Sequence, residues 1–205
     1  KGARNFNFDE IVVLLEEKVH ETVLEINLDA LTSNYNFYKQ KLKNTTKIMV
    51  MVKAFGYGNG GYEIAKQLEH LKVAYLGVAF ADEGIALRKA GITTPIMVLN
   101  PEISSYNAMI AYNLEPEIYS LSGLTSFIEL AKEKNSNAYP IHIKIDTGMH
   151  RLGFEKNNIS ELITLLQYNN FVKVTSIFSH LATSDDLNFS SFTLHQIQLF
   201  DTISK

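Results

Sequence analysis

One pattern repeats along this chain: a short apolar run, a polar turn, and then apolar residues at helical spacing. Six of the runs have the length of buried strands and cover residues 48–52, 74–79, 95–99, 115–119, 141–146 and 174–179. Helical spacing follows them at residues 62–71, 82–90, 103–111, 122–134, 159–168 and 192–203. Regular alternation of strand and helix predicts parallel strands joined by right-handed crossovers.

Two α/β architectures fit this alternation, an open doubly wound sheet and a (β/α)₈ barrel. The sequence contains no GxGxxG or Walker motif that would support the doubly wound sheet. About six strands are visible, whereas a closed barrel has eight. The sequence therefore predicts a TIM-type (β/α)₈ barrel that is incomplete within this chain.

The segment before the first barrel strand has a different pattern. Residues 22–28 alternate between polar and apolar, which predicts a strand with one solvated face. Asp29 then suits the N-cap of a helix, and a further helix is predicted over residues 9–18. We expect a leader over residues 1–20, an entry strand and helix over 21–46, and the partial barrel over 47–205.

Composition narrows the classes of function. The 205 residues carry a net charge of −3, which gives no electrostatic argument for binding nucleic acid or an anionic membrane. No apolar run approaches the roughly 20 residues of a membrane span, and no signal peptide is visible. The absence of cysteine excludes disulfides and thiolate catalysis, and no metal site is predicted. A cytoplasmic protein is consistent with these features.

Candidate chemistry falls at the carboxyl ends of the predicted strands. Lys53 ends the first strand and is followed by four glycines, at positions 56, 58, 60 and 61. A lysine amine that is almost dehydrated there is a candidate nucleophile, and glycine-rich backbone can approach a phosphate. The alternative is a loop lysine that reaches solvent. Lys144, Asp146 and His180 also lie at or near strand ends, the side of a barrel that carries its chemistry.

The segment VKAFGYGNG, residues 52–60, resembles the cofactor-lysine motif of alanine racemases, VVKANAYGHG. Those enzymes are fold-type III pyridoxal phosphate proteins. The resemblance implies that Lys53 forms the Schiff base with pyridoxal 5′-phosphate and that Tyr57 lies near the phosphate of the cofactor. Phe55, Gly56 and Asn59 depart from the family motif but leave these two residues in place.

Two further segments carry the resemblance. IKIDTGMHRLG, residues 143–153, is similar to the family's LKVDTGMGRLG. This match implies that Lys144 is the lysine that is often carbamylated, that Arg151 binds the phenolic oxygen of the cofactor, and that Arg151 and Met149 contact substrate. FSHLATSD, residues 178–185, is similar to GIFTHFATAD and implies that His180 lies near the pyridine ring. The alternatives are a surface ion pair for Arg151 and a structural role for His180.

The resemblance implies interconversion of L- and D-alanine for peptidoglycan precursors by a homodimer. In this family the second proton-transfer group is a tyrosine of the partner subunit's C-terminal domain, which we expect to lie beyond residue 205. The first residues, Lys1-Gly2-Ala3-Arg4, resemble the end of a Mur-type peptidoglycan ligase, so the chain is interpreted as part of a ligase–racemase fusion.

Three alternatives remain: a pyridoxal phosphate-binding module without racemase activity, another fold-type III racemase or decarboxylase, and an inactive structural fragment. We expect the 205-residue chain alone not to racemise alanine. It shows about six strands where closure needs eight, and Lys53 is its one candidate proton-transfer group.

Overall fold

The computed structural model describes residues 24–205. The helix expected over residues 9–18 and the leader over 1–20 lie outside this range. Six strands are present in the described part: β1 (Met49–Met51), β2 (Tyr75–Val78), β3 (Ile96–Val98), β4 (Leu114–Ile118), β5 (Tyr139–Lys144) and β6 (Val172–Phe178). Each falls on one of the six apolar runs of the sequence, so the predicted strands are confirmed.

Helices follow the strands in turn. The longer ones are α2 (Leu28–Lys41), α4 (Gly61–His70), α5 (Ala81–Lys89), α6 (Tyr106–Ala111), α7 (Leu121–Glu133), α8 (Ile159–Gln167) and α9 (Ser190–Ile203). A short element, α3 (Lys53–Tyr57), lies between β1 and α4, and single 3₁₀ turns precede α6, α8 and α9. None of the helices between residues 24 and 205 has the length and apolar character needed to cross a membrane.

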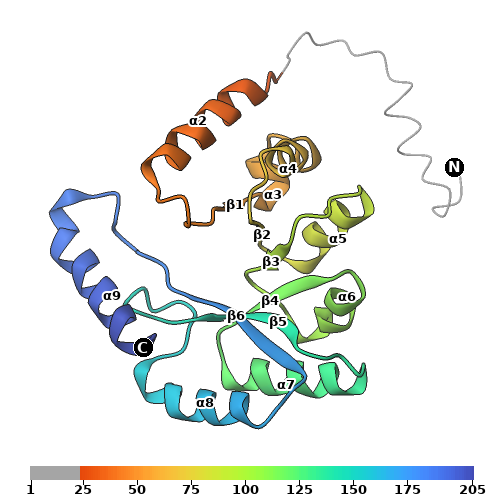
Figure 1. Ribbon diagram of the computed structural model, residues 1–205, viewed down its shortest axis with the longest axis vertical. Coiled ribbons are helices and arrows are strands. Elements are labelled where there is room, and N and C mark those ends of the chain that lie inside the picture. Colours follow the sequence, from red (N-terminus) through yellow and green to blue (C-terminus); the bar gives the residue numbers. More distant parts are fainter. Residues whose placement is uncertain (1–23) are drawn as a thin grey trace, which may run out of the picture.

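The order of the strands distinguishes between the two architectures. All six are parallel, and each pairs with the next one along the chain, in the order β1-β2-β3-β4-β5-β6. A doubly wound sheet reverses its strand order at a switch point, whereas a (β/α)₈ barrel keeps it sequential. The helices lie around the outside of the strands (Figure 1). The predicted barrel architecture is therefore confirmed.

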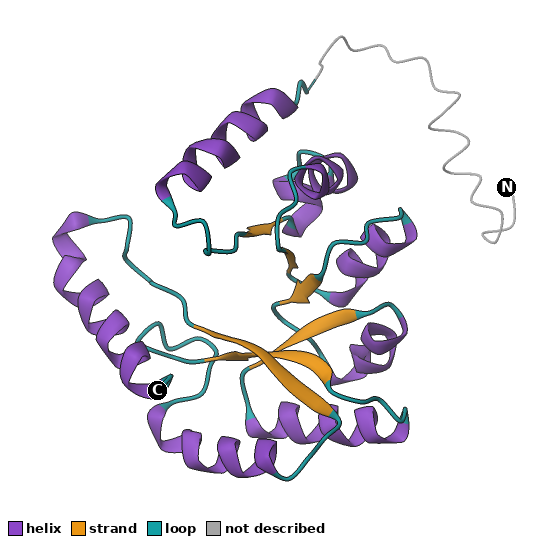
Figure 2. Cartoon of the chain, viewed as in Figure 1, coloured by secondary structure: helices purple, strands orange, loops and turns teal. Residues whose placement is uncertain are grey.

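Side chains alternate between the two faces of the strands. On β4 and β5 the apolar residues Leu114, Ile118, Ile141 and Ile143 are at most 1% exposed and belong to the hydrophobic core. This core lies between the strands and the surrounding helices, which are purple in Figure 2. The alternate positions face the other way, into the barrel, and on β4 and β5 they are polar: Glu115, Glu117, His142 and Lys144.

The strand predicted over residues 22–28 is wrong for the described residues. Residues 24–27 are coil, Leu24 is 71% exposed, and helix α2 already begins at Leu28. An isolated alternating segment gains no ladder hydrogen bonds, and no strand in the described range lies beside it. The N-cap is Asn27, whose Oδ1 accepts from the N–H of Ala30 at 2.9 Å, so Asp29 lies in the first turn instead.

Candidate active site

A cavity of about 700 Å³ opens at the carboxyl ends of the strands. Its lining comes from the ends of β1, β2, β3, β5 and β6 and from the loops that follow them. The lining residues are Met49, Met51, Lys53, Tyr57, Ala79, Leu99, Asn100, Lys144, Arg151, Leu152, Phe178, Ser179 and His180. Five of the six residues to which the family motifs assign a role are among them, and a parallel sheet places such strand ends together at one edge.

Lys53 follows directly after β1 and reaches into this cavity. The backbone of Val52 is held by the neighbouring strand, because its N–H donates to the carbonyl of Gly77 at 2.8 Å. Lys53 Nζ lies 5.9 Å from the centre of the Tyr57 ring, and no hydrogen bond or ion pair holds the amine within residues 24–205. Lys53 is half-buried rather than almost dehydrated, so the sequence overstated its burial. Its amine is nevertheless available to a ligand.

The chain turns in the left-handed sense immediately after Lys53. Ala54, Phe55, Gly56 and Tyr57 have φ values of 52°, 53°, 64° and 58°. Hydrogen bonds from Gly56 N–H to Val52 O and from Gly58 N–H to Ala54 O close this turn. Left-handed backbone is unfavourable by roughly 1–2 kcal/mol per residue for residues other than glycine, so other contacts must hold the segment in place.

Glu83, in the first turn of α5, supplies such contacts. Its Oε1 accepts from the N–H of Ala54 at 2.6 Å, and its Oε2 accepts from Ala79 and Phe80 at 2.7 and 3.2 Å. One carboxylate therefore ties the left-handed turn to the loop after β2. The predicted glycine-rich turn is present, but Tyr57 rather than any of the four glycines lines the cavity.

Lys144 lies at the last position of β5 and forms a buried ion pair. Its Nζ is 3.1 Å from Oε1 of Glu117, and the two side chains are 9% and 0% exposed. The pair is a Coulombic contact without good hydrogen-bond alignment, since neither Glu117 oxygen has a hydrogen-bond donor among residues 24–205. Burial raises the pKa of Glu117 to about 7, although Lys144 and then Arg151 act to lower it.

Asp146 organises the loop after β5. Asp146 Oδ1 accepts from the N–H groups of Gly148, Met149 and His150 at 2.8, 3.0 and 3.1 Å. Burial alone would raise the pKa of Asp146, but these donors and the charge of His150 outweigh it, and the pKa is lowered. Gly153 has a φ of 136°, and a Cβ there would lie 2.5 Å from the N of Asp146. The folded loop places Arg151 at the cavity.

Arg151 and His180 face the cavity from two neighbouring loops. Neither side chain has a hydrogen-bond or ion-pair partner among the residues described. The pKa of His180 is lowered, first because the ring loses solvent at the cavity wall and then because Arg151, Lys144 and Lys53 are positive. The ring is therefore neutral at physiological pH. Gln196 of α9, which is fully buried, supports this loop by donating to the carbonyl of His180 at 3.1 Å.

Comparison with known proteins agrees with this geometry. The family model described as "Alanine racemase, N-terminal domain" matches residues 26–205. The chain belongs to this family. It is 39% identical over 170 residues to alanine racemase 2 of Bacillus subtilis, covering 81% of this chain and 43% of that protein. Alanine racemase 1 of Oceanobacillus iheyensis is 36% identical over 183 residues, or 88% of this chain and 48% of the relative.

Solved structures give the same assignment. The alanine racemase of Clostridium difficile 630 in complex with cycloserine superposes with a TM-score of 0.85 at 35% identity. The match covers 92% of this chain and 52% of that one. The chain thus spans about half the length of the alanine racemases that it resembles.

The sequence did not identify several residues of this alanine racemase-type site. Glu83, Glu117 and Gln196 act through contacts with distant segments, and Asn100 lines the cavity from the loop after β3. Met149 was predicted to contact substrate, but it is not among the lining residues, and its N–H bonds Asp146. Polar residues at every second position of β4 are the signal that could have revealed Glu117.

Proposed function

We propose that the full-length protein is a pyridoxal 5′-phosphate-dependent racemase that interconverts L-alanine and D-alanine. The observation that carries this proposal is the meeting of Lys53, Tyr57, Lys144, Arg151 and His180 at one cavity. These residues come from segments almost 130 positions apart, and all of them lie within residues 26–205, the range that matches the family model.

The residues present fit this cofactor. The aldehyde group of pyridoxal phosphate would react with an amine that has no competing hydrogen-bond or ion-pair partner. Lys53 Nζ meets this requirement within the described range. Anionic oxygens require cationic donors, and the Arg151 guanidinium faces the cavity with none of its donors engaged by residues 24–205. The volume of about 700 Å³ lies in the range of cofactor and ligand pockets.

Lys53 is proposed to hold the cofactor and to move a proton. Pyridoxal phosphate, when bound, withdraws electrons from the Cα of the amino acid and makes its proton acidic. Two lysines line the cavity, and of these Lys144 is paired with Glu117, whereas Lys53 has no such partner within residues 24–205 and can accept or return that proton on one face of Cα. The half-buried position leaves the amine accessible.

The other residues are proposed to orient the ligand. Arg151 offers a rigid, permanently charged set of donors, which suits a phenolic oxygen. The Tyr57 hydroxyl is a donor for the phosphate, and the neutral ring of His180 can pack beside the pyridine ring without adding positive charge. Leu99, Leu152 and Phe178 supply the apolar part of the lining.

Several features of the whole protein belong to the same proposal. We expect a homodimer in the cytoplasm that supplies D-alanine for peptidoglycan. The second proton-transfer group, a tyrosine in the family, would come from a C-terminal domain, and residues 1–20 would derive from a preceding ligase-type domain.

The proposal is tested on the full-length protein with added pyridoxal phosphate. Wild type should show a new absorbance band in the near-ultraviolet to visible range, and borohydride followed by peptide mapping should place the cofactor on Lys53. Lys53→Ala should lose the band, the label and alanine racemisation. Lys47→Ala is the matched control, because Lys47 is an exposed lysine two residues before the same strand.

The outcomes separate the alternatives. A band that survives Lys53→Ala would show that another residue binds the cofactor. Labelling of Lys53 without racemisation of alanine would identify a cofactor-binding module, and racemisation of a different amino acid would identify another enzyme of this fold type.

A further inference from the structure

Gln196 is the only buried residue of α9 and is 0% exposed. Its Oε1 accepts from the N–H of Ala182 at 3.0 Å, and its Nε2 donates to the carbonyl of His180 at 3.1 Å and to the hydroxyl of Thr147 at 3.2 Å. The N–H group can only donate and the carbonyl can only accept, so these partners fix the orientation of the amide. A buried amide is costly without partners, and here both nitrogen donors and the oxygen have one.

The contacts continue from Gln196 into a directed chain of hydroxyl groups. Ser179 Oγ donates to the carbonyl of Ile145 at 2.8 Å, which uses its single proton. The hydroxyl of Thr147, 2.7 Å away, therefore donates to Ser179 and accepts from Gln196. Hydroxyl groups that both accept and donate polarise one another, which strengthens such a chain. The chain ends at the cavity, because Ser179 is one of the lining residues.

Two loops meet at this amide. Thr147 belongs to the loop after β5, which carries Arg151, whereas His180 and Ala182 belong to the loop after β6. We propose that Gln196 is a positioning residue that couples these two loops, so that Arg151 and His180 keep a fixed arrangement at the cavity. The inference deepens the proposed function, and its catalytic consequence rests on that function.

The loop after β5 transmits the contact to Arg151 because it is closed on itself. The N–H of Asp146 donates to the carbonyl of Phe154 at 3.0 Å, and Oδ1 of Asp146 accepts from three backbone N–H groups inside the loop. Helix α9 also packs directly on this loop, since a Cβ at Gly148 would lie 3.1 Å from the ring of Phe192. A contact at the start of the loop therefore restrains the whole loop.

The alternative is that Gln196 serves only to dock α9 on the barrel. Apolar residues of the same helix already do this, because Phe200 and Ile203 pack against the hydrophobic core. Such contacts leave no buried polar atoms to satisfy. An amide whose three hydrogen bonds all go to the two loops beside the cavity is suited to fixing those loops.

The coupling is tested by amide hydrogen exchange of the full-length protein without cofactor, followed by mass spectrometry. Gln196→Met keeps the length of the side chain and removes its three hydrogen bonds. Exchange in peptides covering residues 146–153 and 180–185 should become at least about tenfold faster, while peptides of β2 to β4 keep the wild-type rate. Gln198→Met is the matched control, because Gln198 is an exposed glutamine of the same helix and should change neither loop.

Thr147→Val provides a second and milder test, which does not depend on the folding of Gln196→Met. It removes one hydroxyl from the loop after β5, yet it should also accelerate exchange over residues 180–185 in the other loop. Faster exchange confined to the substituted loop would overturn the coupling. Loop exchange in Gln196→Met that matches Gln198→Met, or that rises equally in β2 to β4, would also overturn it.

The positioning role is tested by adding pyridoxal phosphate and alanine. Thr147→Val should lower kcat at least about tenfold, because small displacements of orienting groups are costly to the rate. Faster loop exchange together with wild-type kcat would overturn the positioning role. Absence of racemisation in the wild type would instead contradict the proposed function, and the exchange rates would still decide whether Gln196 couples the loops.

Discussion

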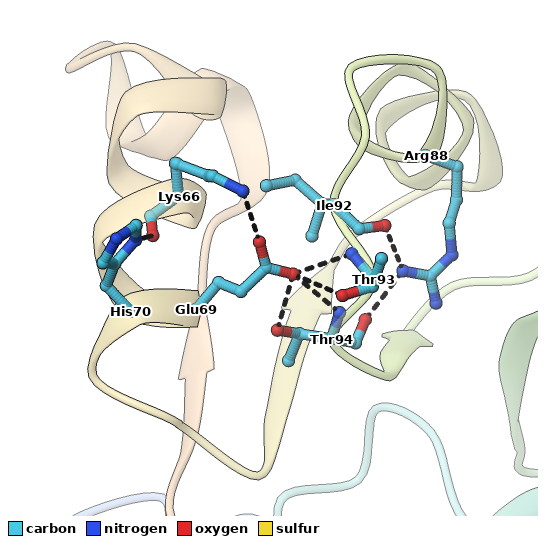
Figure 3. A network of polar contacts seen from close by, with 7 residues as sticks. All are labelled: Lys66, Glu69, His70, Arg88, Ile92, Thr93 and Thr94. Carbon is cyan, nitrogen blue, oxygen red and sulfur yellow. Dashed lines mark hydrogen bonds and ion pairs between the residues drawn. The ribbon is translucent and has the colours of Figure 1, made fainter.

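Glu69 and Glu117 are both carboxylates with a lysine partner, and they lie at opposite ends of the barrel. Glu69 is 2.8 Å from Lys66, and its Oε1 also accepts from the N–H and hydroxyl groups of Thr93 and Thr94, as Figure 3 shows. The hydrogen bond from Lys66 is the largest of the effects that lower the pKa of Glu69 to about 2. Glu117 has Lys144 alone, and burial raises its pKa to about 7.

The difference shows that aligned hydrogen bonds and access to solvent keep a carboxylate ionised, whereas a buried lysine without such alignment does not offset the loss of hydration. The Glu69 cluster closes the loop that enters β3, and Arg88 reinforces it by donating to the carbonyls of Ile92 and Thr94 at 2.8 and 2.7 Å (Figure 3). Every charge there has its partners, which is typical of a structural contact. At the carboxyl ends of the strands, Lys53 and Arg151 face a cavity without hydrogen-bond or ion-pair partners among residues 24–205, which is typical of a site.

Removal of Lys144 should have the largest effect on stability. Lys144→Met leaves an uncompensated carboxylate in the barrel, and the free energy of unfolding at pH 8 should fall by about 3 kcal/mol. Urea unfolding of the full-length protein, followed by circular dichroism, measures this change. Lys173→Met is the control, because Lys173 of β6 is exposed and should change little.

Removal of both partners of the buried pair tests the same comparison. The double variant Glu117→Gln/Lys144→Met carries no unpaired charge, so it should recover most of the loss. Equal stability of Lys144→Met and Lys173→Met would show that the buried pair has no energetic importance, and the contrast with Glu69 would then fail.

Removal of Glu69 should have an intermediate effect. Glu69→Ala leaves the N–H groups of Thr93 and Thr94 without their acceptor, so the free energy of unfolding should fall by about 2 kcal/mol. Lys66→Ala should be much milder, because Lys66 is 42% exposed and the four threonine contacts of Glu69 remain. If both substitutions destabilise equally in urea unfolding, the lysine rather than the backbone donors dominates this cluster.

Much of the fold could be predicted from the sequence because the signals were local. Each strand was an apolar run of the right length, and each long helix had its own apolar stripe, so all six strands fall within about two residues of their predicted ends. The exception was residues 24–28, where alternation predicted a strand but no neighbouring strand pairs with it in the described range. Strand formation depends on a partner, which alternation alone does not reveal.

The site was predictable only in part, for a related reason. The motifs placed Lys53, Lys144 and His180 at or near strand ends and assigned Arg151 to the loop after β5. The residues that hold them act across space: Glu83 binds Ala54 from 29 positions away, and Gln196 binds Thr147 from 49. The glycines indicated a turn after Lys53, but positive φ at Ala54 was not predictable because most residues avoid that region.

The pH dependence of stability gives the most specific effect, and the smallest one when it is compared per pH unit. For Glu69 the pKa falls from 4.5 to about 2 on folding, so its contribution is present above about pH 4.5 and is lost as the pH falls towards 2. For Glu117 the pKa rises from 4.5 to about 7, so the folded state binds the extra proton and stability decreases as the pH rises from about 4.5 to 7. The free energy of unfolding therefore increases with pH because of Glu69 and decreases with pH because of Glu117.

Each carboxylate changes the free energy of unfolding by at most about 1.4 kcal/mol per pH unit, since one proton is involved. The free energy of unfolding should be measured in urea at half-unit steps from pH 3 to pH 8. Glu69→Gln should reduce its increase with pH below about pH 4.5 and leave its decrease above that pH unchanged. Glu117→Gln should reduce the decrease in the free energy of unfolding between about pH 4.5 and 7 and leave the increase at lower pH unchanged. If Glu117→Gln instead removes a rise in stability with pH, the carboxylate is ionised at low pH in the folded protein, and donors that bind it more strongly than Lys144 must lie beside it.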